Sequence, residues 1–412
     1  MIKPFNALSP QVRQYLVVTG NYWAFTLTDG ALRMLVVLHF HQLGYSPLEV
    51  AMLFIFYELF GVITNLIGGW IGAYLGLNAT MNAGLAIQVI ALSLLLVPEP
   101  WLTVGLVMTA QALSGIAKDL NKMSAKSAIR LLVPKDAKGV LFHWVAMLTG
   151  SKNALKGIGF FLGGALLAAF GFRSAIAIMA SALALVWLFS MIALRKNLGK
   201  SSTKPKFNQL LSKSRAINCL SAARLFLFAA RDVWFVVALP VYLSSTLGWN
   251  NWAVGTFLAS WVIGYGIIQS ITPKLIGENT LLGPDKTLLF RWAAWLSLAP
   301  LGIVAAMSVG ADIEISLVVG LFVFGAIFAV NSALHSFLII SYANEDGVSL
   351  DVGFYYMANA MGRLLGTLLS GWVFQSWGFT YCLWISSLLI AISAGVSLML
   401  PTDRSDKERL IQ

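Results

Sequence analysis

The feature that most constrains this chain is a succession of apolar segments, each about 20 residues or longer. A helix of about 20 apolar residues spans the hydrocarbon core of a bilayer. Only 11% of the residues are charged, against about 25% in soluble domains. With short loops, 412 residues accommodate about twelve such helices. Strands alternating at about ten-residue spacing are absent, which excludes a membrane barrel. We therefore predict an all-α integral membrane protein.

The apolar segments and the turn residues between them predict where each helix lies. Short polar or Gly/Pro-containing stretches, such as the P-E-P turn at 98–100, separate the segments. The expected helices are 14–40, 47–75, 80–97, 101 to about 126, 140–170, 173–194, 216–243, 251–276, 288–309, 315–342, 352–377 and 380–400.

The segment 195–215 divides the chain into halves. It is polar and contains seven Lys/Arg and no acid, so the positive-inside rule predicts that it is cytoplasmic. Six helices precede it, which predicts that both termini are cytoplasmic as well. The expected domains are a six-helix bundle at 1–194, this linker at 195–215, a second bundle at 216–400 and a tail at 401–412.

The second half repeats the first. A shift of about 207 positions places residues 152–172 over 359–379. The matched positions are Lys156 with Arg363, Gly159 with Gly366, Gly164 with Gly371, and Gly171-Phe172 with Gly378-Phe379. A cation at the same depth in both halves is typical of parallel repeats with a site near the bilayer midplane. Two six-helix pseudo-symmetric halves joined by a basic loop resemble a major facilitator transporter.

Cations near the middle of the expected helices supply the functional argument. They are Lys152 and Lys156, one turn apart on one helix face, together with Arg231 and Arg363. If bare, the four would together cost on the order of 12 kcal/mol in the membrane. They therefore need water, a partner acid or a bound anion.

Acids at this depth are fewer, which favours an anionic substrate. The candidates for proton coupling or ion pairing are Asp29, Glu58 and Asp232. We expect Asp29 to pair with Arg33, and Asp232 to pair with Arg224 or Arg231. Glu58 is either a proton carrier or a partner of the helix 352–377.

Other candidate residues have competing interpretations. Lys118, Lys122 and Lys126 share a helix face, and either bind substrate or reach lipid headgroups at a helix end. Tyr355 and Tyr356 either orient a substrate oxygen or pack between helices. His335 and Asn331 are expected to form interhelical hydrogen bonds. The predicted substrate-binding set is Arg33, Lys118, Lys122, Lys152, Lys156, Arg224, Arg231, Tyr355, Asn359 and Arg363.

Several classes of function are excluded by the residues themselves. Cys219 and Cys382 are isolated from each other, so we predict no metal site and no cofactor. No nucleophile–base pair is apparent, so an enzyme is not expected. The net charge of +11 does not indicate nucleic acid, because the basic residues lie in loops or inside apolar helices.

Four stretches resemble a specific family. They are G-N-Y-W-A-F-T-L-T-D-G-A-L-R-M-L-V-V-L-H-F-H-Q-L-G-Y-S-P (20–47), S-G-I-A-K-D-L-N-K-M-S-A-K-S (114–127), T-G-S-K-N-A-L-K-G-I-G-F-F-L-G-G (149–164) and the stretch 212–243. The chain is similar there to the ArsJ organoarsenical efflux permeases. The resemblance implies a bacterial inner-membrane protein that exports 1-arseno-3-phosphoglycerate. It also implies a functional partner, a glyceraldehyde-3-phosphate dehydrogenase that makes this ester from arsenate. A pentavalent oxyanion ester needs cations and no thiolates.

Two alternatives remain from the sequence. The first is an organophosphate–phosphate antiporter, a family that similarly places an arginine in its first and seventh helices, as Arg33 and Arg231 do here. The second is a transporter-like anion sensor. The linker of about 21 residues leaves no soluble domain to transmit a signal, which disfavours a sensor.

Overall fold

The computed structural model describes residues 9–44, 53–133, 138–194, 198–200, 214–276, 285–344 and 348–401. Most of the predicted linker 195–215, residues 402–412 of the predicted tail and the start of the helix predicted at 47–75 lie outside these ranges. Within them the chain is helical and contains no strand. The elements are α1 (Pro10–Gln42), α3 (Ile55–Leu75), α4 (Leu77–Leu94), η2 (Glu99–Trp101), α5 (Val104–Leu132), α6 (Lys138–Ala193), α7 (Arg215–Phe235), α8 (Ala238–Ser245), α9 (Asn251–Leu275), α10 (Lys286–Ser308), α11 (Ile313–Tyr342), α12 (Val348–Trp377) and α13 (Phe379–Leu398).

These elements confirm the predicted positions of the helices. The longest, α6, has non-helical backbone at Gly171, where φ is 73°, so it consists of two arms. A positive φ is costly for residues with a Cβ, and glycine is the residue that adopts it freely. If the two arms of α6 are counted separately and α7 and α8 together, the described residues form twelve long segments.

Local sequence sets several of the helix starts. The side chains of Thr103, Ser214, Asn250 and Asp285 each accept a hydrogen bond from a backbone N–H three residues ahead. Such N-caps satisfy one of the donors that a helix leaves unpaired at its start. Helices α5, α7, α9 and α10 therefore begin where a capping residue precedes an apolar segment.

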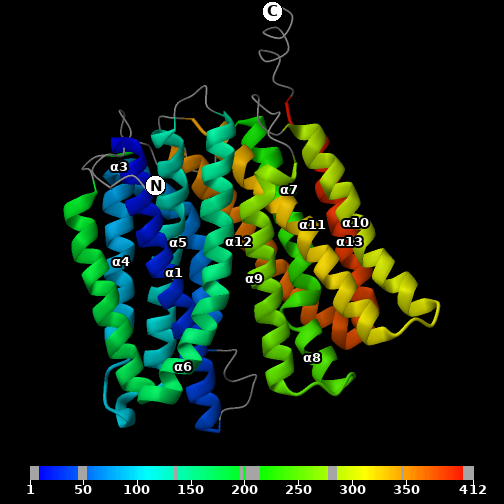
Figure 1. Cartoon of the computed structure of the whole chain (residues 1–412), viewed down its shortest axis with the longest axis horizontal. Coiled ribbons are helices and arrows are strands. Elements are labelled where there is room, and N and C mark those ends of the chain that lie inside the picture. Colours follow the sequence, from blue (N-terminus) through cyan, green and yellow to red (C-terminus); the bar gives the residue numbers. More distant parts are fainter. Residues whose placement is uncertain are drawn as a thin grey trace, which may run out of the picture. The chain divides into compact units, whose positions relative to one another are not determined.

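The chain forms two compact units, neither of which is continuous in sequence. Unit 1 contains residues 1–135, 151–212 and 343–357, and unit 2 contains 136–150, 213–342 and 358–412. In unit 1, α5 packs against α1, α3 and α4. In unit 2, α13 packs against α7 and α10, and α11 packs against α9 and α10 (Figure 1).

The predicted pseudo-symmetry appears in the glycines. Gly171 between the arms of α6 and Gly378 between α12 and α13 both have positive φ, 73° and 85°. In unit 1, a Cβ on Gly159 would lie 2.7 Å from the carbonyl oxygen of Leu27 in α1. In unit 2, a Cβ on Gly366 would lie 2.6 Å from that of Ala229 in α7. Each half thus packs its fifth helix on its first through the aligned glycine, with backbones in direct contact.

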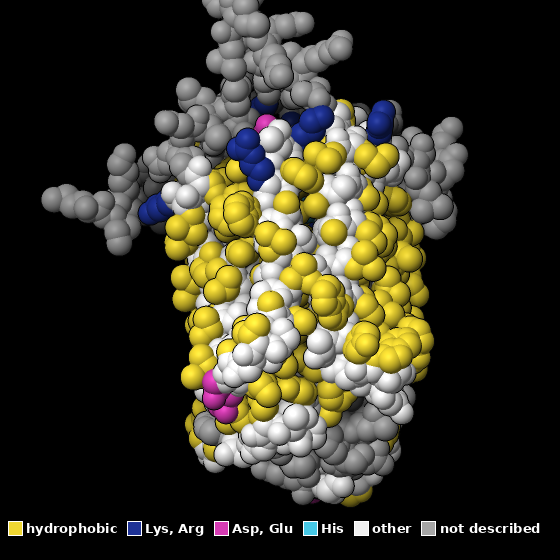
Figure 2. Space-filling model, turned by 90° about the vertical axis from the view of Figure 1, so that its right-hand side faces the viewer, with side chains coloured by type: hydrophobic (Ala, Val, Ile, Leu, Met, Phe, Trp, Pro, Cys, Tyr) yellow, Lys and Arg dark blue, Asp and Glu magenta, His cyan; other side chains and the backbone are white. Residues whose placement is uncertain are grey.

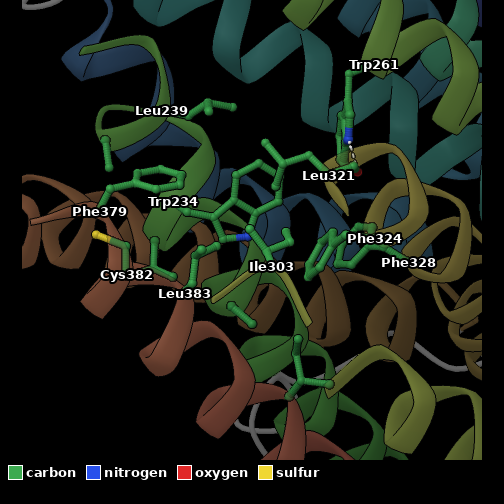
Figure 3. Packing of buried hydrophobic residues seen from close by; sticks show 14 of the residues in the cluster. Trp234, Leu239, Trp261, Ile303, Leu321, Phe324, Phe328, Phe379, Cys382 and Leu383 are labelled. Carbon is green, nitrogen blue, oxygen red and sulfur yellow. Dashed lines mark hydrogen bonds between the residues drawn. The ribbon is translucent and has the colours of Figure 1, made fainter. Parts of the chain in front are cut away.

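Aromatic side chains dominate the core of unit 2. Trp234 is fully buried, and its ring meets those of Trp261 and Phe324 edge-on, at centroid distances of 5.8 and 5.1 Å. Trp261 also donates a hydrogen bond of 2.8 Å to the carbonyl of Leu321, drawn as a dashed line in Figure 3. Because this bond satisfies the only polar atom of the indole, the large ring is buried without an unpaired donor.

Eight helices of the described residues are long and apolar enough to cross a membrane. Three further helices, α1, α5 and α12, are long enough but fall outside this group, because they carry the charged side chains discussed below. Figure 2 shows hydrophobic side chains over the middle of one face, Lys and Arg near one end and a group of acidic side chains near the other. This distribution is that of a membrane-embedded surface.

Candidate functional site

The charged residues of α1 and α3 in unit 1 form a compact network. Tyr57 donates its hydroxyl hydrogen to Asp29, with oxygen–oxygen distances of 2.7 and 2.9 Å to the two carboxylate oxygens. Arg33 pairs with Glu58 at 3.4 Å, and its guanidinium lies 4.9 Å from the centre of the Tyr57 ring. Tyr57 therefore connects this network, because its hydroxyl binds the carboxylate of Asp29 and its ring contacts the guanidinium of Arg33.

These contacts correct one prediction and add a partner for Glu58. Asp29 and Arg33 are four residues apart and were expected to pair, but no ion pair joins them in the described part of the chain. Spacing of four puts two side chains on one helix face, yet each here turns to a residue of α3 instead. Glu58 pairs with Arg33 of α1, and the two alternatives for it, a proton carrier or a partner of the helix 352–377, stay predictions.

The lysines of α5 form the second part of the unit 1 site. Lys118 and Lys122 both pair with Asp119, Lys118 at 3.8 Å and Lys122 in direct hydrogen-bond contact. Asp119 is buried, with only 1% of its side chain exposed. Lys118 is the central residue of α5, which places it well inside the helix and away from either end. The headgroup interpretation therefore does not fit Lys118.

Two tyrosine rings hold the same lysines from another side. The ammonium of Lys118 lies 3.8 Å from the centre of the Tyr57 ring. The ammoniums of Lys122 and Lys126 lie 4.7 and 4.9 Å from the centre of the Tyr356 ring. An aromatic face stabilises a cation without placing a counter-charge beside it.

Lys152 and Lys156 lie near the middle of the first arm of α6, where both are half-buried. Lys152 donates to the side-chain oxygen of Asn153 at 3.4 Å. The backbone of Lys156 packs directly against α1, because a Cβ on Gly30 would lie 2.8 Å from its carbonyl oxygen. The position of Lys156 relative to α1 is therefore set by backbone contact.

In unit 2, one buried carboxylate joins two arginines. Asp232, with no exposed side-chain area, accepts a hydrogen bond of 2.6 Å from Arg231. Its other oxygen accepts from Arg363 of α12 at 3.3 Å. The predicted pair of Asp232 with an arginine of its own helix forms with Arg231. About a third of the Arg363 side chain remains exposed.

Arg224 lies in a separate polar network of unit 2. It is buried and donates to the side-chain oxygen of Asn359 at 2.9 Å and to the hydroxyl of Ser332 at 3.1 Å. Tyr265 and Gln269 of α9 also donate to the Ser332 hydroxyl, at 2.9 and 3.0 Å. Asn359 thus holds the side chain of Arg224 in place. Together these hydrogen bonds connect α7, α9, α11 and α12 around the buried guanidinium of Arg224.

The remaining predicted residues are buried within helices. Tyr355 is fully buried and packs edge-on against Tyr356, with ring centroids 5.0 Å apart. Asn331 donates to the carbonyl of Ile327 in its own helix, and among the described residues that amide group makes no interhelical hydrogen bond, so the expectation for Asn331 was wrong there. His335 is fully buried, and neither of its ring nitrogens has a hydrogen-bond partner among the described residues.

Asp119 and Tyr57 are the two members of this site that sequence reasoning missed. Asp119 follows Lys118 and precedes Lys122 by three residues, a spacing that predicts contact on a helix. Because Asp119 lies among several lysines, it is absent from the intramembrane carboxylates that the sequence predicts. Nothing in the sequence around Tyr57 distinguishes it from a packing residue. The described residues contain no group of three or more His, Cys, Asp or Glu placed to hold a metal ion.

Two pseudo-symmetric helical units with charged side chains in the middle of their helices are typical of a multi-pass membrane transporter. The sequence profile of the Major Facilitator Superfamily matches residues 16–294, more than half of the chain, so the chain belongs to this family. A comparison with curated protein sequences gives no match.

Solved structures share the fold. The human organic anion transporter MFSD10 (TETRAN) is similar with a TM-score of 0.75 and 16% identity, over 95% of this chain and 100% of that one. The fucose:proton symporter FucP of E. coli is similar with a TM-score of 0.73 and 14% identity, over 95% and 100%. A bacterial homologue of the iron transporter ferroportin, in an outward-facing state, is similar with a TM-score of 0.71 and 14% identity, over 94% and 98%. At these identities the likeness concerns the fold alone.

Proposed function

We propose that this transporter exports a polyanionic organoarsenical, 1-arseno-3-phosphoglycerate, from the bacterial cytoplasm by alternating access and so confers resistance to arsenate. The observation that carries the proposal is the excess of cations over acids inside both units. The acidic groups of the substrate would neutralise this excess of positive charge.

In unit 1, the described site residues comprise six cations and three acids. The cations are Arg33, Lys118, Lys122, Lys126, Lys152 and Lys156, and the acids are Asp29, Glu58 and Asp119. In unit 2, the cations are Arg224, Arg231 and Arg363, and the acid is Asp232. The excess is three positive charges in unit 1 and two in unit 2. A site of this sign suits a ligand with several negative charges, since each charge-assisted hydrogen bond contributes roughly 1.5–3 kcal/mol.

The identity of the substrate rests on the resemblance of four stretches, 20–47, 114–127, 149–164 and 212–243, to the ArsJ permeases. All four stretches contain cations of the site, among them Arg33, Lys118, Lys156 and Arg231. The proposed functional partner is the glyceraldehyde-3-phosphate dehydrogenase that makes the ester, and the proposed location is the inner membrane.

The proposed orientation places both termini in the cytoplasm. In unit 1, Gln14 near the start of α1 donates to the carbonyl of Ala193, just before the basic linker. In unit 2, Cys219 near the start of α7 contacts the carbonyl of Met399 at the end of α13. The start of α1 and the end of α13 therefore each lie, within their own unit, beside residues that adjoin the linker, and the positive-inside rule assigns the linker to the cytoplasm.

The test is arsenate tolerance in a sensitive bacterium that expresses the transporter, the dehydrogenase, or both. We expect tolerance only with both proteins, because the transporter exports what the dehydrogenase makes. Lys156→Ala and Arg363→Ala should each abolish tolerance at unchanged membrane expression. The matched control is Lys200→Ala, which removes an exposed lysine outside the site. Tolerance without the dehydrogenase, or full tolerance in both site variants, would contradict the proposal.

An organophosphate–phosphate antiporter is the second candidate, favoured by the arginines in α1 and α7. Both arginines are held in ion pairs, Arg33 with Glu58 and Arg231 with Asp232, which leaves them less available to a phosphate. Counterflow in proteoliposomes separates the candidates. An antiporter takes up glycerol phosphate only against internal phosphate, whereas the proposed exporter prefers a two-headed anion such as 1,3-bisphosphoglycerate.

A further inference from the structure

In the cluster of Lys118, Asp119 and Lys122, a buried carboxylate pairs with two lysines, and the proposed function does not explain its presence. One buried carboxylate faces two ammonium groups, and its Oδ2 lies toward α3, 3.0 Å from where a Cβ on Gly61 would be. Asp119 thus sits behind the lysines, against a glycine of the neighbouring helix.

Each of these lysines has a second partner that is not an acid. Lys118 lies on the ring of Tyr57, and Lys122 lies on that of Tyr356. If the carboxylate is neutralised or displaced, both ammonium groups keep an aromatic face to rest on. The acids nearest in the network are engaged elsewhere, Asp29 with Tyr57 and Glu58 with Arg33. The charge of Asp119 can therefore change without dismantling the network around it.

An acidic group of a substrate that binds Lys118 and Lys122 competes with Asp119 for the same two ammoniums. Two anions cannot share them without repulsion, so only one is fully engaged at a time. When the substrate has left, Asp119 lowers the charge of this cluster from +2 to +1. A carrier that reorients while empty must enclose its own charges away from water, and the energetic cost rises steeply with uncompensated charge.

We propose that Asp119 is an internal counter-anion that replaces the substrate on Lys118 and Lys122 and lets the empty carrier return. The proposal rests on the proposed function, export of an anion, and adds how the cycle closes. It follows that export proceeds as net efflux, with no anion required to travel back. Asp119 is then a positioning residue that acts through the two lysines.

The test uses the full-length protein in proteoliposomes with labelled 1,3-bisphosphoglycerate as the probe. Net efflux into anion-free buffer requires the empty return step, whereas exchange against external unlabelled probe does not. Asp119→Asn keeps the shape but removes the charge, so the empty cluster stays at +2. We expect net efflux at least tenfold slower, exchange retained, and probe binding tighter by about 5- to 150-fold, the range of typical couplings between sites.

Two further variants make the result decisive. Asp119→Asn combined with Lys122→Gln returns the cluster to +1, so net efflux should recover while probe binding weakens. Asp312→Asn is the matched control. It makes the same chemical change at the start of α11, where the Asp312 side chain caps the N–H of Ile315 and asparagine caps equally well.

Each outcome has a distinct meaning. Net efflux of Asp119→Asn within twofold of wild type overturns the proposal. If Asp119→Asn loses exchange as well, the double variant decides: recovered net efflux supports the proposal, and no recovery overturns it in favour of a structural role. A wild type that only exchanges overturns it and favours the antiporter. A wild type that moves no anion at all refutes the proposed function itself.

Discussion

The direct backbone contact between α1 and the first arm of α6 leads to a sharp prediction about two glycines. A Cβ on Gly159 would lie 2.7 Å from the carbonyl oxygen of Leu27 and 3.1 Å from the Cα of Gly30. A Cβ on Gly164, five residues later in the same arm, would meet only the end of Leu38, at 3.8 Å. Gly159→Ala and Gly164→Ala thus add the same methyl group to the same helix in opposite surroundings.

The expected magnitudes follow from these distances. An ordinary contact begins at 3.4 Å, so Gly159→Ala must separate the two backbones by at least 3.4 − 2.7 = 0.7 Å. Overpacking of this kind costs about 1–3 kcal/mol. Gly164→Ala meets no obstacle and gains about 1 kcal/mol of helix propensity. The two variants should therefore differ by about 2–4 kcal/mol.

The assay is the apparent melting temperature of the detergent-purified protein, at one scan rate for all variants because unfolding of such proteins is often irreversible. For a folded body of about 200 residues, 1 kcal/mol corresponds to roughly 2–4 °C. We expect Gly159→Ala to melt about 4 to 16 °C below Gly164→Ala. Equal melting temperatures, or a less stable Gly164→Ala, would refute the backbone contact as described.

Three further substitutions test other contacts. Tyr57→Phe removes the hydroxyl that binds Asp29 but keeps the ring, so it should destabilise the protein by about 1.5–3 kcal/mol, and Tyr57→Leu by more, in the same melting assay. Asp232→Asn leaves two arginines without their carboxylate and should lower the yield of monodisperse protein, with a cost of about 3–5 kcal/mol; unchanged yield would contradict a buried pair. Trp261→Phe removes the hydrogen bond to Leu321 and part of a buried ring, and should cost about 1–3 kcal/mol in chemical or thermal unfolding, where a neutral effect would count against the packing in Figure 3.

The positions of the helices could be predicted from the sequence because hydropathy depends on local composition. The helix expected at 315–342 is observed at Ile313–Tyr342, and the separation expected after residue 170 occurs at Gly171. The repeat was also predictable, because a glycine required for backbone contact, such as Gly159 or Gly366, cannot be replaced without a clash.

Partner choice could not be predicted, since it depends on neighbouring helices. Asp29 and Arg33 share a face of α1. Asp29 nevertheless binds Tyr57 of α3 and Arg33 binds Glu58 of α3, because these partners lie closer to the two charges than the two charges lie to each other. The contacts of Lys118 and Lys122 with the rings of Tyr57 and Tyr356 could not be predicted for the same reason. Asp119 was overlooked because its depth in the fold, and not its sequence neighbourhood, distinguishes it from a solvated acid.

The three helices that are too polar to count as membrane spans, α1, α5 and α12, also constrain how the chain is inserted into the bilayer. Charged residues at a helix centre each cost about 2.5–3.5 kcal/mol on insertion scales, so α5 with Lys118, Asp119 and Lys122 cannot partition into lipid by itself. Its neighbour α3 is long and apolar enough to cross a membrane and carries Tyr57, which contacts both α1 and α5. We therefore expect α1 to stay at the translocation machinery until α3 emerges, and α5 to leave it only as part of an assembled group. We expect membrane integration of this transporter to be a cooperative event of several helices, in which the charges of α1, α5 and α12 set the order.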